Sequence, residues 1–399
     1  MDRLSVVKKF RPLLIKQLRE DILPFWTSPE ALGDPIGNFP TYRAQTGKPD
    51  VNQWHYTRML GRQIYIYFAS YYLLKDEALL TWGLKGLSHL EDLENPLGGY
   101  YAVSTAAGER VDEPISIQDQ CYSVFPYAMA FRVTRNHRYL DRLWAFVDFI
   151  DKGPYCHTDG SYCDALFPDL VTKARFKTDS LNLVSVIDFL NAVLIPTILV
   201  APESDITSDR IKILIKWCDL LVSEFYGQGI FWNDRTNRTD WHALHVDLGH
   251  TSKAYGVLLK ADNILIRWGK KQRRYQKITD VYPTIAEAAS DARVGWWTDF
   301  DGCATRFTHR ELSWWRHILI DQTVLLYSGS YDNLTEALGC GVAAWLNLPF
   351  VDKKRKVRGI RELLTADGLP VTDDDEAFSK ANCWKNGYHE VEHVVSFFE

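Results

Sequence analysis

The sequence predicts an all-α protein in which six helix pairs, joined by short β-hairpins, close into a ring as one domain over residues 1–399. Three observations lead to this fold class. A glycine followed by aromatic residues and a turn recurs about every 60 to 70 residues, which leaves room for two helices and a hairpin. Helical periodicity fills the intervals. No comparable series of alternating β-branched strands is present.

The glycine signals mark the boundaries between the predicted repeats. Glycine suits these places because it readily adopts the positive φ angles that tight hairpin turns require. The signals lie at residues 37–47, 98–108, 160–162, 229–232, 295–302 and 359–368.

Each interval between the glycine signals carries apolar residues at three- and four-residue spacing, the pattern of a helix with one buried face. Most of these stretches are bounded by Gly, Pro, Asp or Asn, as helices commonly are. The predicted helices cover residues 4–23, 51–74, 76–93, 117–133, 139–150, 180–200, 208–225, 250–268, 270–290, 312–327 and 334–346.

The arrangement of the helix pairs decides which residues can share a site. A ring places one helix of each pair inside, so that the starts of the inner helices line a central pocket. The alternative is an open helical solenoid, in which the terminal repeats do not touch. The ring therefore predicts that the first and last repeats contribute to one site.

Composition narrows the class of function. The formal net charge of -5 argues against a dedicated nucleic-acid-binding protein. Seven scattered cysteines without a CxxC pair predict reduced thiols in a cytoplasmic protein. No signal peptide and no membrane span are predicted. The sequence has no P-loop, no dinucleotide fingerprint and no metal-ligand spacing, so we expect no cofactor and no metal.

Two histidines stand out as candidates for acid–base chemistry. His250 follows Gly249 at the start of an apolar helix. A lone histidine at a helix start more commonly caps and packs than reacts. A second glycine–aromatic–histidine signal, however, ends at His389, and the ring would allow the two imidazoles to face each other.

Short motifs in a fixed order along nearly the whole chain resemble those of the N-acylglucosamine 2-epimerase family. This family also includes cellobiose 2-epimerases, mannose isomerases and sulfoquinovose isomerases. The motifs are residues 22–26 (ILPFW), 61–65 (GRQIY), 119–122 (DQCY), 181–184 (LNLV), 248–250 (LGH), 313–317 (SWWRH), 384–385 (WK) and 388–389 (YH).

The resemblance implies an (α/α)6 barrel and a cofactor-independent enzyme that acts at C1 and C2 of a reducing hexose or hexosamine. Such a reaction removes the weakly acidic proton beside the carbonyl, stabilises an enediolate, and returns a proton to another face or atom. Two bases and one fixed cation would suffice. The implied partner is a small-molecule sugar, with no nucleic acid and no membrane, and the aromatic-rich outer helices are compatible with a homodimer.

The resemblance also assigns roles to individual residues. His250 and His389 match the family's acid–base pair, and Arg62 matches the arginine that holds the carbonyl and enediolate oxygens. The residues implied to bind substrate are Asp119, Asn182, Lys253, Trp314, His317 and Trp384.

Four positions depart from the family pattern. Lys253 stands where a glutamate is usual, and Glu392 stands where an arginine is usual. Leu319 replaces a further glutamate and Ser185 a polar or acidic residue. Because the sign of charge is inverted at both 253 and 392, we expect these two side chains to form a charge-swapped pair.

Two other classes of function remain open at this point. A glycoside hydrolase or lyase on the same fold would use paired carboxylates, for which Asp119, Asp299 and Asp301 are available. The lost acidic positions also fit a non-catalytic sugar-binding relative. The sequence does not distinguish epimerisation from aldose–ketose isomerisation.

Overall fold

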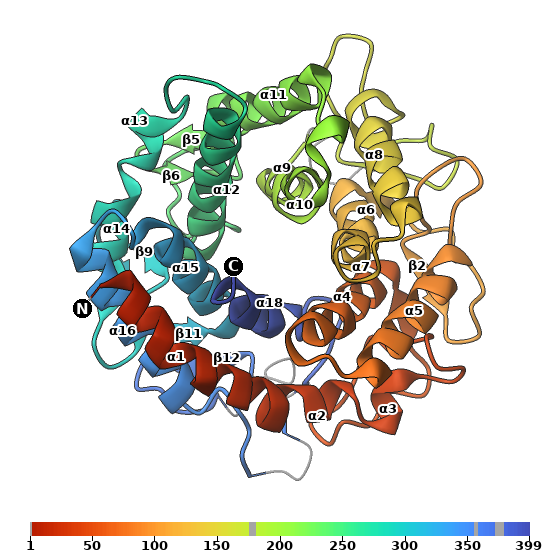
Figure 1. Ribbon diagram of the computed structural model, residues 1–399, viewed down its shortest axis with the longest axis horizontal. Coiled ribbons are helices and arrows are strands. Elements are labelled where there is room, and N and C mark those ends of the chain that lie inside the picture. The colour runs from red at the N-terminus through yellow and green to blue at the C-terminus, as the bar shows by residue number, and fades with distance from the viewer. Residues whose placement is uncertain (1, 175–180, 355–357, 372–378) are drawn as a thin grey trace. The chain divides into compact units, whose positions relative to one another are not determined.

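The computed structural model describes residues 2–174, 181–354, 358–371 and 379–399. Ser180, the predicted start of the helix over 180–200, lies outside the described residues. The chain divides into two compact units, each described here by itself (Figure 1). Unit 1 comprises Met1–Phe25, Cys218–Lys380 and His389–Glu399, and unit 2 comprises Trp26–Trp217 and Ala381–Tyr388. The single domain over residues 1–399 stays a prediction.

Unit 2 is built around helix α4 (Thr57–Leu74). Every residue from Thr57 to Ser70 of this helix is buried, as expected of a helix that neighbours cover on all sides. Helices α5 (Glu77–Glu91), α6 (Ile117–Val124) and α7 (Pro126–Thr134) pack against it. The other elements are α3 (Pro29–Leu32), β1 (Trp54–Tyr56), β2 (Val103–Thr105), β3 (Ile115–Ser116), α8 (His137–Lys152), β4 (Ala165–Leu166), α9 (Leu183–Asp188), η2 (Phe189–Leu194), α10 (Ile195–Val200) and η3 (Glu203–Asp205).

Unit 1 is built around α12 (Leu248–Arg267) and α15 (Trp314–Tyr327), which pack against each other. Helix α16 (Asp332–Asn347) packs on α15 and on α1 (Arg3–Gln17). The other elements are η1 (Leu18–Ile22), β5 (Tyr226–Gly227), β6 (Ile230–Phe231), α13 (Gln276–Thr279), α14 (Tyr282–Ala289), β7 (Ser290–Asp291), β8 (Gly295–Trp296), β9 (Asp299–Phe300), β10 (Phe307–Thr308), β11 (Glu311–Ser313) and β12 (Leu363–Thr365). The division between the units falls inside α2 (Leu23–Trp26), α11 (Ser208–Phe225) and α18 (Tyr388–Ser396).

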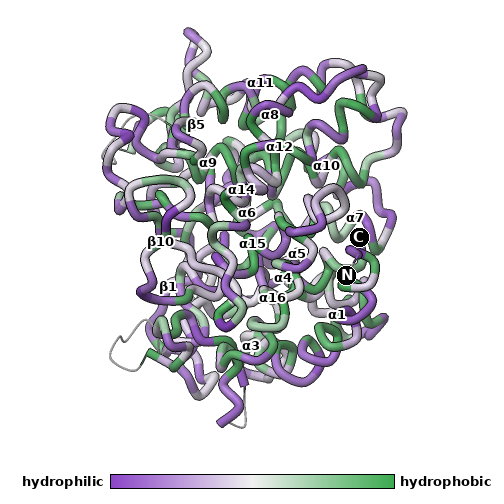
Figure 2. Tube along the Cα trace, turned by 90° about the vertical axis from the view of Figure 1, so that its left-hand side faces the viewer, coloured by the Kyte–Doolittle hydropathy of each residue, from purple (hydrophilic) through white to green (hydrophobic). Residues whose placement is uncertain are grey.

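The strands form two-stranded antiparallel sheets, of which β5–β6, β7–β8 and β9–β10 are hairpins, whereas β1–β2, β3–β4 and β11–β12 each join strands that helices separate along the chain. In unit 2, β1 pairs with β2 and β3 with β4. In unit 1 the pairs are β5 with β6, β7 with β8, β9 with β10 and β11 with β12. Hydrophobic residues concentrate along the helices and hydrophilic residues along the connections (Figure 2).

One loop conformation recurs where the glycine signals were read. In one loop the bridge Arg43↔Pro49 encloses Gly47, which has a φ of 85°. In another the bridge Cys156↔Tyr162 encloses Gly160, which has a φ of 83°. In both loops the glycine N–H donates to the carbonyl three residues earlier. This is a three-residue hairpin loop whose last residue is left-handed, which explains the glycine. The same geometry is found at Gly98, Gly108 and Gly368.

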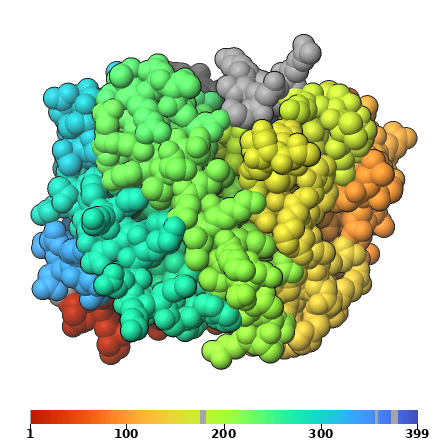
Figure 3. Space-filling view, turned by 90° about the horizontal axis from the view of Figure 1, so that it is seen from above, coloured from red at the N-terminus to blue at the C-terminus, as the bar shows by residue number. Residues whose placement is uncertain are grey.

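The most apolar stretch of the chain forms α9, a π-helical turn (η2) and α10, in the green part of the chain in Figure 3. Residues Leu183–Val200 are long and apolar enough to cross a membrane, but 78% of this stretch is buried inside the protein. This stretch is therefore a buried core segment of the protein.

Several parts of the secondary structure differ from the prediction. Leu312 and Ser313 belong to strand β11, so α15 begins only at Trp314. Residues 54–56 form strand β1, so α4 begins only at Thr57. The predicted helix over 270–290 is replaced by α13 and α14, because the backbone N–H groups of Arg274 and Tyr275 bond to the Asp262 carboxylate instead of to a helical carbonyl. Helix α18 was not predicted.

Candidate functional site

His250 lies in the first turn of α12, where Asp247 is the N-cap residue. The Oδ1 atom of Asp247 accepts a hydrogen bond from the His250 backbone N–H at 2.9 Å. Its Oδ2 atom lies 2.6 Å from the imidazole Nδ1 of His250. One carboxylate therefore caps the helix and also contacts the ring of the candidate base.

The glycine before His250 allows another helix to approach closely. A Cβ atom at Gly249 would lie 2.8 Å from the Arg316 side chain and 3.0 Å from the Trp315 ring. A larger residue would push α15 away from the start of α12. The Gly-His sequence is thus explained by packing as well as by the turn.

Trp315 brings the two candidate histidines of unit 1 to one aromatic ring. The centroid of the His250 ring lies 4.8 Å from that of Trp315, in an edge-on arrangement. The His389 ring lies 6.3 Å from Trp315 in a stacked arrangement, and 6.3 Å from Trp314 edge-on. Both imidazoles predicted from the sequence therefore contact the same indole, which the sequence analysis did not select.

Asp247 is held in its charged form by its neighbours. Arg316 Nε lies 3.7 Å from Asp247 Oδ1, and Arg316 Nη1 donates to Asp299 Oδ1 at 2.7 Å. Burial by itself would raise the pKa of Asp247, but its electrostatic interactions with His250 and Arg316, with the hydrogen bonds from His250, hold that pKa well below its usual range. Because an ionised carboxylate can only accept hydrogen bonds, Nδ1 of His250 must be the donor between them.

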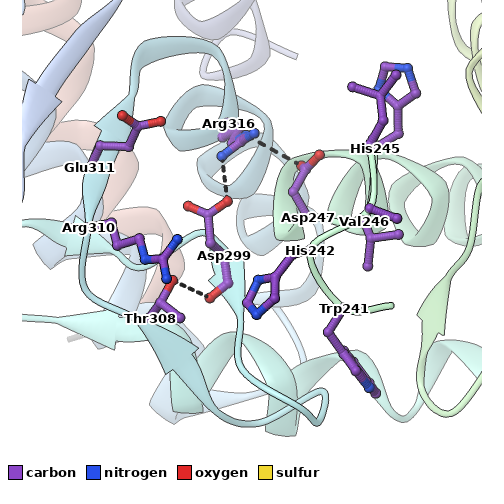
Figure 4. A pocket seen from close by; sticks show the side chains of 12 residues that line it. Trp241, His242, His245, Val246, Asp247, Asp299, Thr308, Arg310, Glu311 and Arg316 are labelled. Atoms are coloured by element: carbon purple, nitrogen blue, oxygen red, sulfur yellow. Dashed lines mark hydrogen bonds and ion pairs between the residues drawn. The ribbon is translucent and has the colours of Figure 1, made fainter. Parts of the chain in front are cut away.

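A polar pocket of about 390 Å³ opens beside these residues (Figure 4). Asp247, Arg316 and Asp299 line one part of it, with Arg316 between the two carboxylates, as Figure 4 shows. The mixture of carboxylate, guanidinium, imidazole and indole groups suits a neutral ligand rich in hydroxyl groups. The other lining residues are Trp241, His242, Ala243, Leu244, His245, Val246, Thr308, Arg310 and Glu311.

Of the side chains in unit 1 that depart from the family pattern, Lys253 and Leu319 are buried and Glu392 is half-buried. Lys253, one helical turn after His250, is 8% exposed, and Leu319 is 4% exposed. Burial raises the pKa of the Glu392 carboxyl, while the positive charges of Lys260 and Lys253 oppose that rise. The charge-swapped pair of Lys253 and Glu392 stays a prediction.

His317 lies in the interior between α15 and α16, whereas Trp315 lies beside His250. Its Nε2 atom lies 2.9 Å from the Gly341 carbonyl and 3.8 Å from Asp321. Asp321 in turn lies 3.1 Å from Nε2 of His393. Burial lowers the pKa of His317, so the neutral ring is favoured.

Arg62 lies in unit 2, buried within an aromatic cage. Its guanidinium is 3.7 Å from the centre of the Tyr122 ring and 4.7 Å from that of Tyr388. Its Nη1 atom donates to the Trp384 carbonyl at 3.2 Å. Burial alone would lower the pKa of Arg62, but the two tyrosines and Asp188 raise it, so the group is a permanent cation.

Trp384 contacts α4, the helix that carries Arg62. Arg58, one turn before Arg62 on α4, donates to the Cys383 carbonyl at 3.1 Å and lies 4.3 Å from the centre of the Trp384 ring. Trp384 is nevertheless 56% exposed, which leaves indole surface for a ligand.

Asp119 and Asn182 hold the starts of helices in unit 2. Asp119 forms a reciprocal capping box with Ser116 at the start of α6 and an ion pair of 2.7 Å with Arg58. Asn182 caps α9 through Ser185 and donates to Asp164 at 2.8 Å. Both polar groups are thus engaged in local structure.

The sequence analysis missed Asp247, Trp315 and Arg316 in unit 1, and Arg58 in unit 2. A signal existed for Asp247, because an aspartate directly before the first turn of a helix is a common N-cap residue. Within the described residues, no group of three or more His, Cys, Asp or Glu side chains is placed to hold a metal ion.

Solved structures of sugar-converting enzymes share this fold. A cellobiose 2-epimerase from Bacillus thermoamylovorans B4167 matches with a TM-score of 0.80 and 17% identity, over 98% of this chain and 99% of its own. A cellobiose 2-epimerase from Spirochaeta thermophila DSM 6192 matches with a TM-score of 0.80 and 16% identity, over 98% and 96%. A D-mannose isomerase matches with a TM-score of 0.75 and 15% identity, over 98% and 97%.

No protein-family model and no curated protein sequence matches the chain. At the identities of these solved structures, the likeness shows the fold. The protein is all-α with short β-hairpins and has the fold class of (α/α)6 barrels, which confirms the fold class predicted from the sequence.

Proposed function

We propose that the protein is a cofactor-independent sugar epimerase or isomerase that acts at C1 and C2 of a reducing hexose or hexosamine. The observation that carries this proposal is the pair of imidazoles, His250 and His389, against the ring of Trp315. The fold shared with cellobiose 2-epimerases and a mannose isomerase supports it.

The two imidazoles divide the proton transfers between them. One takes the proton from C2, and the electrons of the C–H bond form the double bond of an enediolate between C1 and C2. The other imidazole returns a proton to the opposite face of C2, which gives the epimer. In isomerisation the proton is returned to C1 while the hydroxyl proton of O2 moves to O1, which gives the ketose. Arg62 is proposed as the cation that stabilises the enediolate oxygens, because its charge is permanent.

The pocket beside Asp247 is proposed to bind hydroxyl groups of the sugar. Its lining offers acceptors at Asp299 and Glu311 and donors at Arg310 and Thr308, which suits a polyol better than an ion of one sign. Trp384 offers an exposed indole face of the kind on which sugar rings stack.

A glycoside hydrolase is less well supported by the carboxylates. Asp119 is paired with Arg58, Asp299 with Arg316, and Asp301 with Arg306. Each of these acids is thus committed to a cation, whereas hydrolysis needs one carboxyl group that keeps its proton. Release of new reducing ends from an oligosaccharide would favour hydrolysis over the proposal.

Substitution of the histidines tests the acid–base roles. We expect His250→Ala and His389→Ala each to lower the rate of solvent deuterium exchange into the sugar by at least about 100-fold, because each removes one proton carrier. The control is His309→Asn, an exposed histidine of the same unit that stacks on Trp297. Full exchange activity in either alanine variant would remove that histidine from the mechanism. Sugar binding without any exchange in the wild type would instead support a non-catalytic relative.

A further inference from the structure

The contact between Asp247 and His250 has a geometry that helix capping alone does not require. An N-cap aspartate needs one oxygen for the backbone N–H two or three residues ahead, and Asp247 Oδ1 fills that role. The other oxygen, Oδ2, lies 2.6 Å from the His250 ring nitrogen Nδ1. The second contact fixes the imidazole itself.

The carboxylate is buried and held from its other side. The Asp247 side chain is 4% exposed, and Arg316 lies between it and Asp299 (Figure 4). The groups packed around the His250 ring are Asp247, the Trp315 indole and the His245 ring at 4.7 Å. Of these, Asp247 is the anion, so it determines the orientation and the tautomer of the imidazole.

We propose that Asp247 is a positioning residue for His250: it binds Nδ1–H, leaves Nε2 as the atom that exchanges a proton, and is itself held by Arg316 and Asp299. This inference rests on the proposed function for its catalytic consequence. When Nε2 takes up a proton, the ring becomes an imidazolium, and the adjacent carboxylate stabilises that charge. The carboxylate keeps its own charge throughout.

The position one helical turn after His250 is occupied by Lys253, which bears on where a carboxylate can contact the ring. A carboxylate one turn after His250 could have contacted the ring, but that position carries a buried lysine. The carboxylate of this chain instead lies one turn before the histidine, at the helix cap.

The test separates positioning from capping. Asp247→Asn keeps an oxygen that caps the helix nearly as well as aspartate but removes the charge from the ring contact. We expect a fall in kcat for deuterium exchange of about 100-fold or more, with KM changed by less than about threefold. The matched control is Asp76→Asn, the N-cap of α5 that accepts from the Ala78 N–H at 3.0 Å. Its kcat should be unchanged, and the melting temperatures of both variants should remain near that of the wild type.

A second readout does not depend on turnover. In protein with ¹⁵N-labelled histidine, the His250 signals, assigned by their loss in His250→Gln, should show the Nδ1–H tautomer in the wild type. In Asp247→Asn an amide group replaces the carboxylate that accepts from Nδ1–H, so the fraction of the Nδ1–H tautomer should fall. A wild-type Nε2–H tautomer, or an Asp247→Asn variant with wild-type kcat, would overturn the proposal. A normal tautomer in a protein that exchanges no sugar would overturn the proposed function and leave the positioning contact standing.

Discussion

At the residue scale, the least expected feature of unit 1 is a buried lysine one turn from the candidate base. Burial raises the pKa of the nearby Glu392 carboxyl, and the positive charges of Lys260 and Lys253 oppose that rise. A buried charge is stable only when an opposite charge or hydrogen bonds compensate it. We therefore propose that Lys253 and Glu392 act as one electrostatic unit.

This coupling predicts a non-additive pair of substitutions. Lys253→Glu places a second carboxylate near Glu392, and we expect it to lower the free energy of unfolding by about 3 kcal/mol. Glu392→Arg should destabilise the protein similarly, because it faces Lys253 and Lys260. The double variant should recover most of the loss in urea denaturation. Single effects that simply add in the double variant would show that the side chains are independent.

The sequence identified the histidines but not all of their neighbours. His250 and His389 were predicted from glycine and aromatic signals in the chain. Trp314 was selected instead of Trp315, because successive residues on a helix point about 100° apart and the start of α15 was not fixed by the sequence. Asp247 was not singled out, since its contact with the ring depends on the side-chain conformation.

At the element scale, the recurring hairpin loops depend on left-handed glycines. At Gly160, with a φ of 83°, an added Cβ meets no atom within 4 Å. Substitution there thus tests backbone conformation alone, without a steric clash. Gly339 in α16 has equally open surroundings but lies within a helix.

The two glycines are therefore predicted to respond in opposite ways to alanine. Gly160→Ala should lower the free energy of unfolding by about 1 kcal/mol, because alanine is strained at positive φ. Gly339→Ala should raise it by about 0.5 to 1 kcal/mol, through the higher helix propensity of alanine. Both are measurable by urea denaturation. Equal effects of the same sign would contradict this account of the loops.

Periodicity predicted the long helices well and their interruptions poorly. The predicted helix over 208–225 coincides with α11, Ser208–Phe225. The stretch 270–290 failed because the Asp262 carboxylate, distant in sequence, captures the backbone N–H groups of Arg274 and Tyr275. Such a tertiary contact leaves no mark in local spacing.

At the scale of the whole molecule, buried histidines make stability depend on pH. Burial, with a smaller effect of His89, lowers the pKa of His55 from 6.5 to about 4. Between these values the unfolded chain binds a proton that the folded chain does not, so stability must fall as the pH falls below 6.5. From pH 7 to pH 5 this one histidine should cost about 2 kcal/mol.

His55→Gln should reduce that pH dependence. Glutamine keeps an N–H donor for Asn38, whose Oδ1 lies 2.6 Å from Nδ1 of His55, but it does not titrate. The difference in unfolding free energy between pH 7 and pH 5 should be smaller in the variant by about 2 kcal/mol. An unchanged difference would mean that His55 is not kept neutral in the folded state.

The fold class was predictable because glycine turns and helical stretches recur along the whole chain, and solved structures confirm it over 98% of the chain. The sugar was not predictable from the sequence, and we expect its choice to depend on loop side chains such as residues 241–247, which line the pocket.

The central claim is that this chain transfers a proton at C2 of a reducing sugar. The most direct measurement is ¹H NMR of the wild-type protein with a panel of aldoses and ketoses in deuterated water. We predict that the C2 proton signal of at least one hexose or hexosamine decreases as deuterium enters, with an epimer or ketose formed and no added cofactor. A folded protein that leaves every C2 proton of the panel in place would contradict the account.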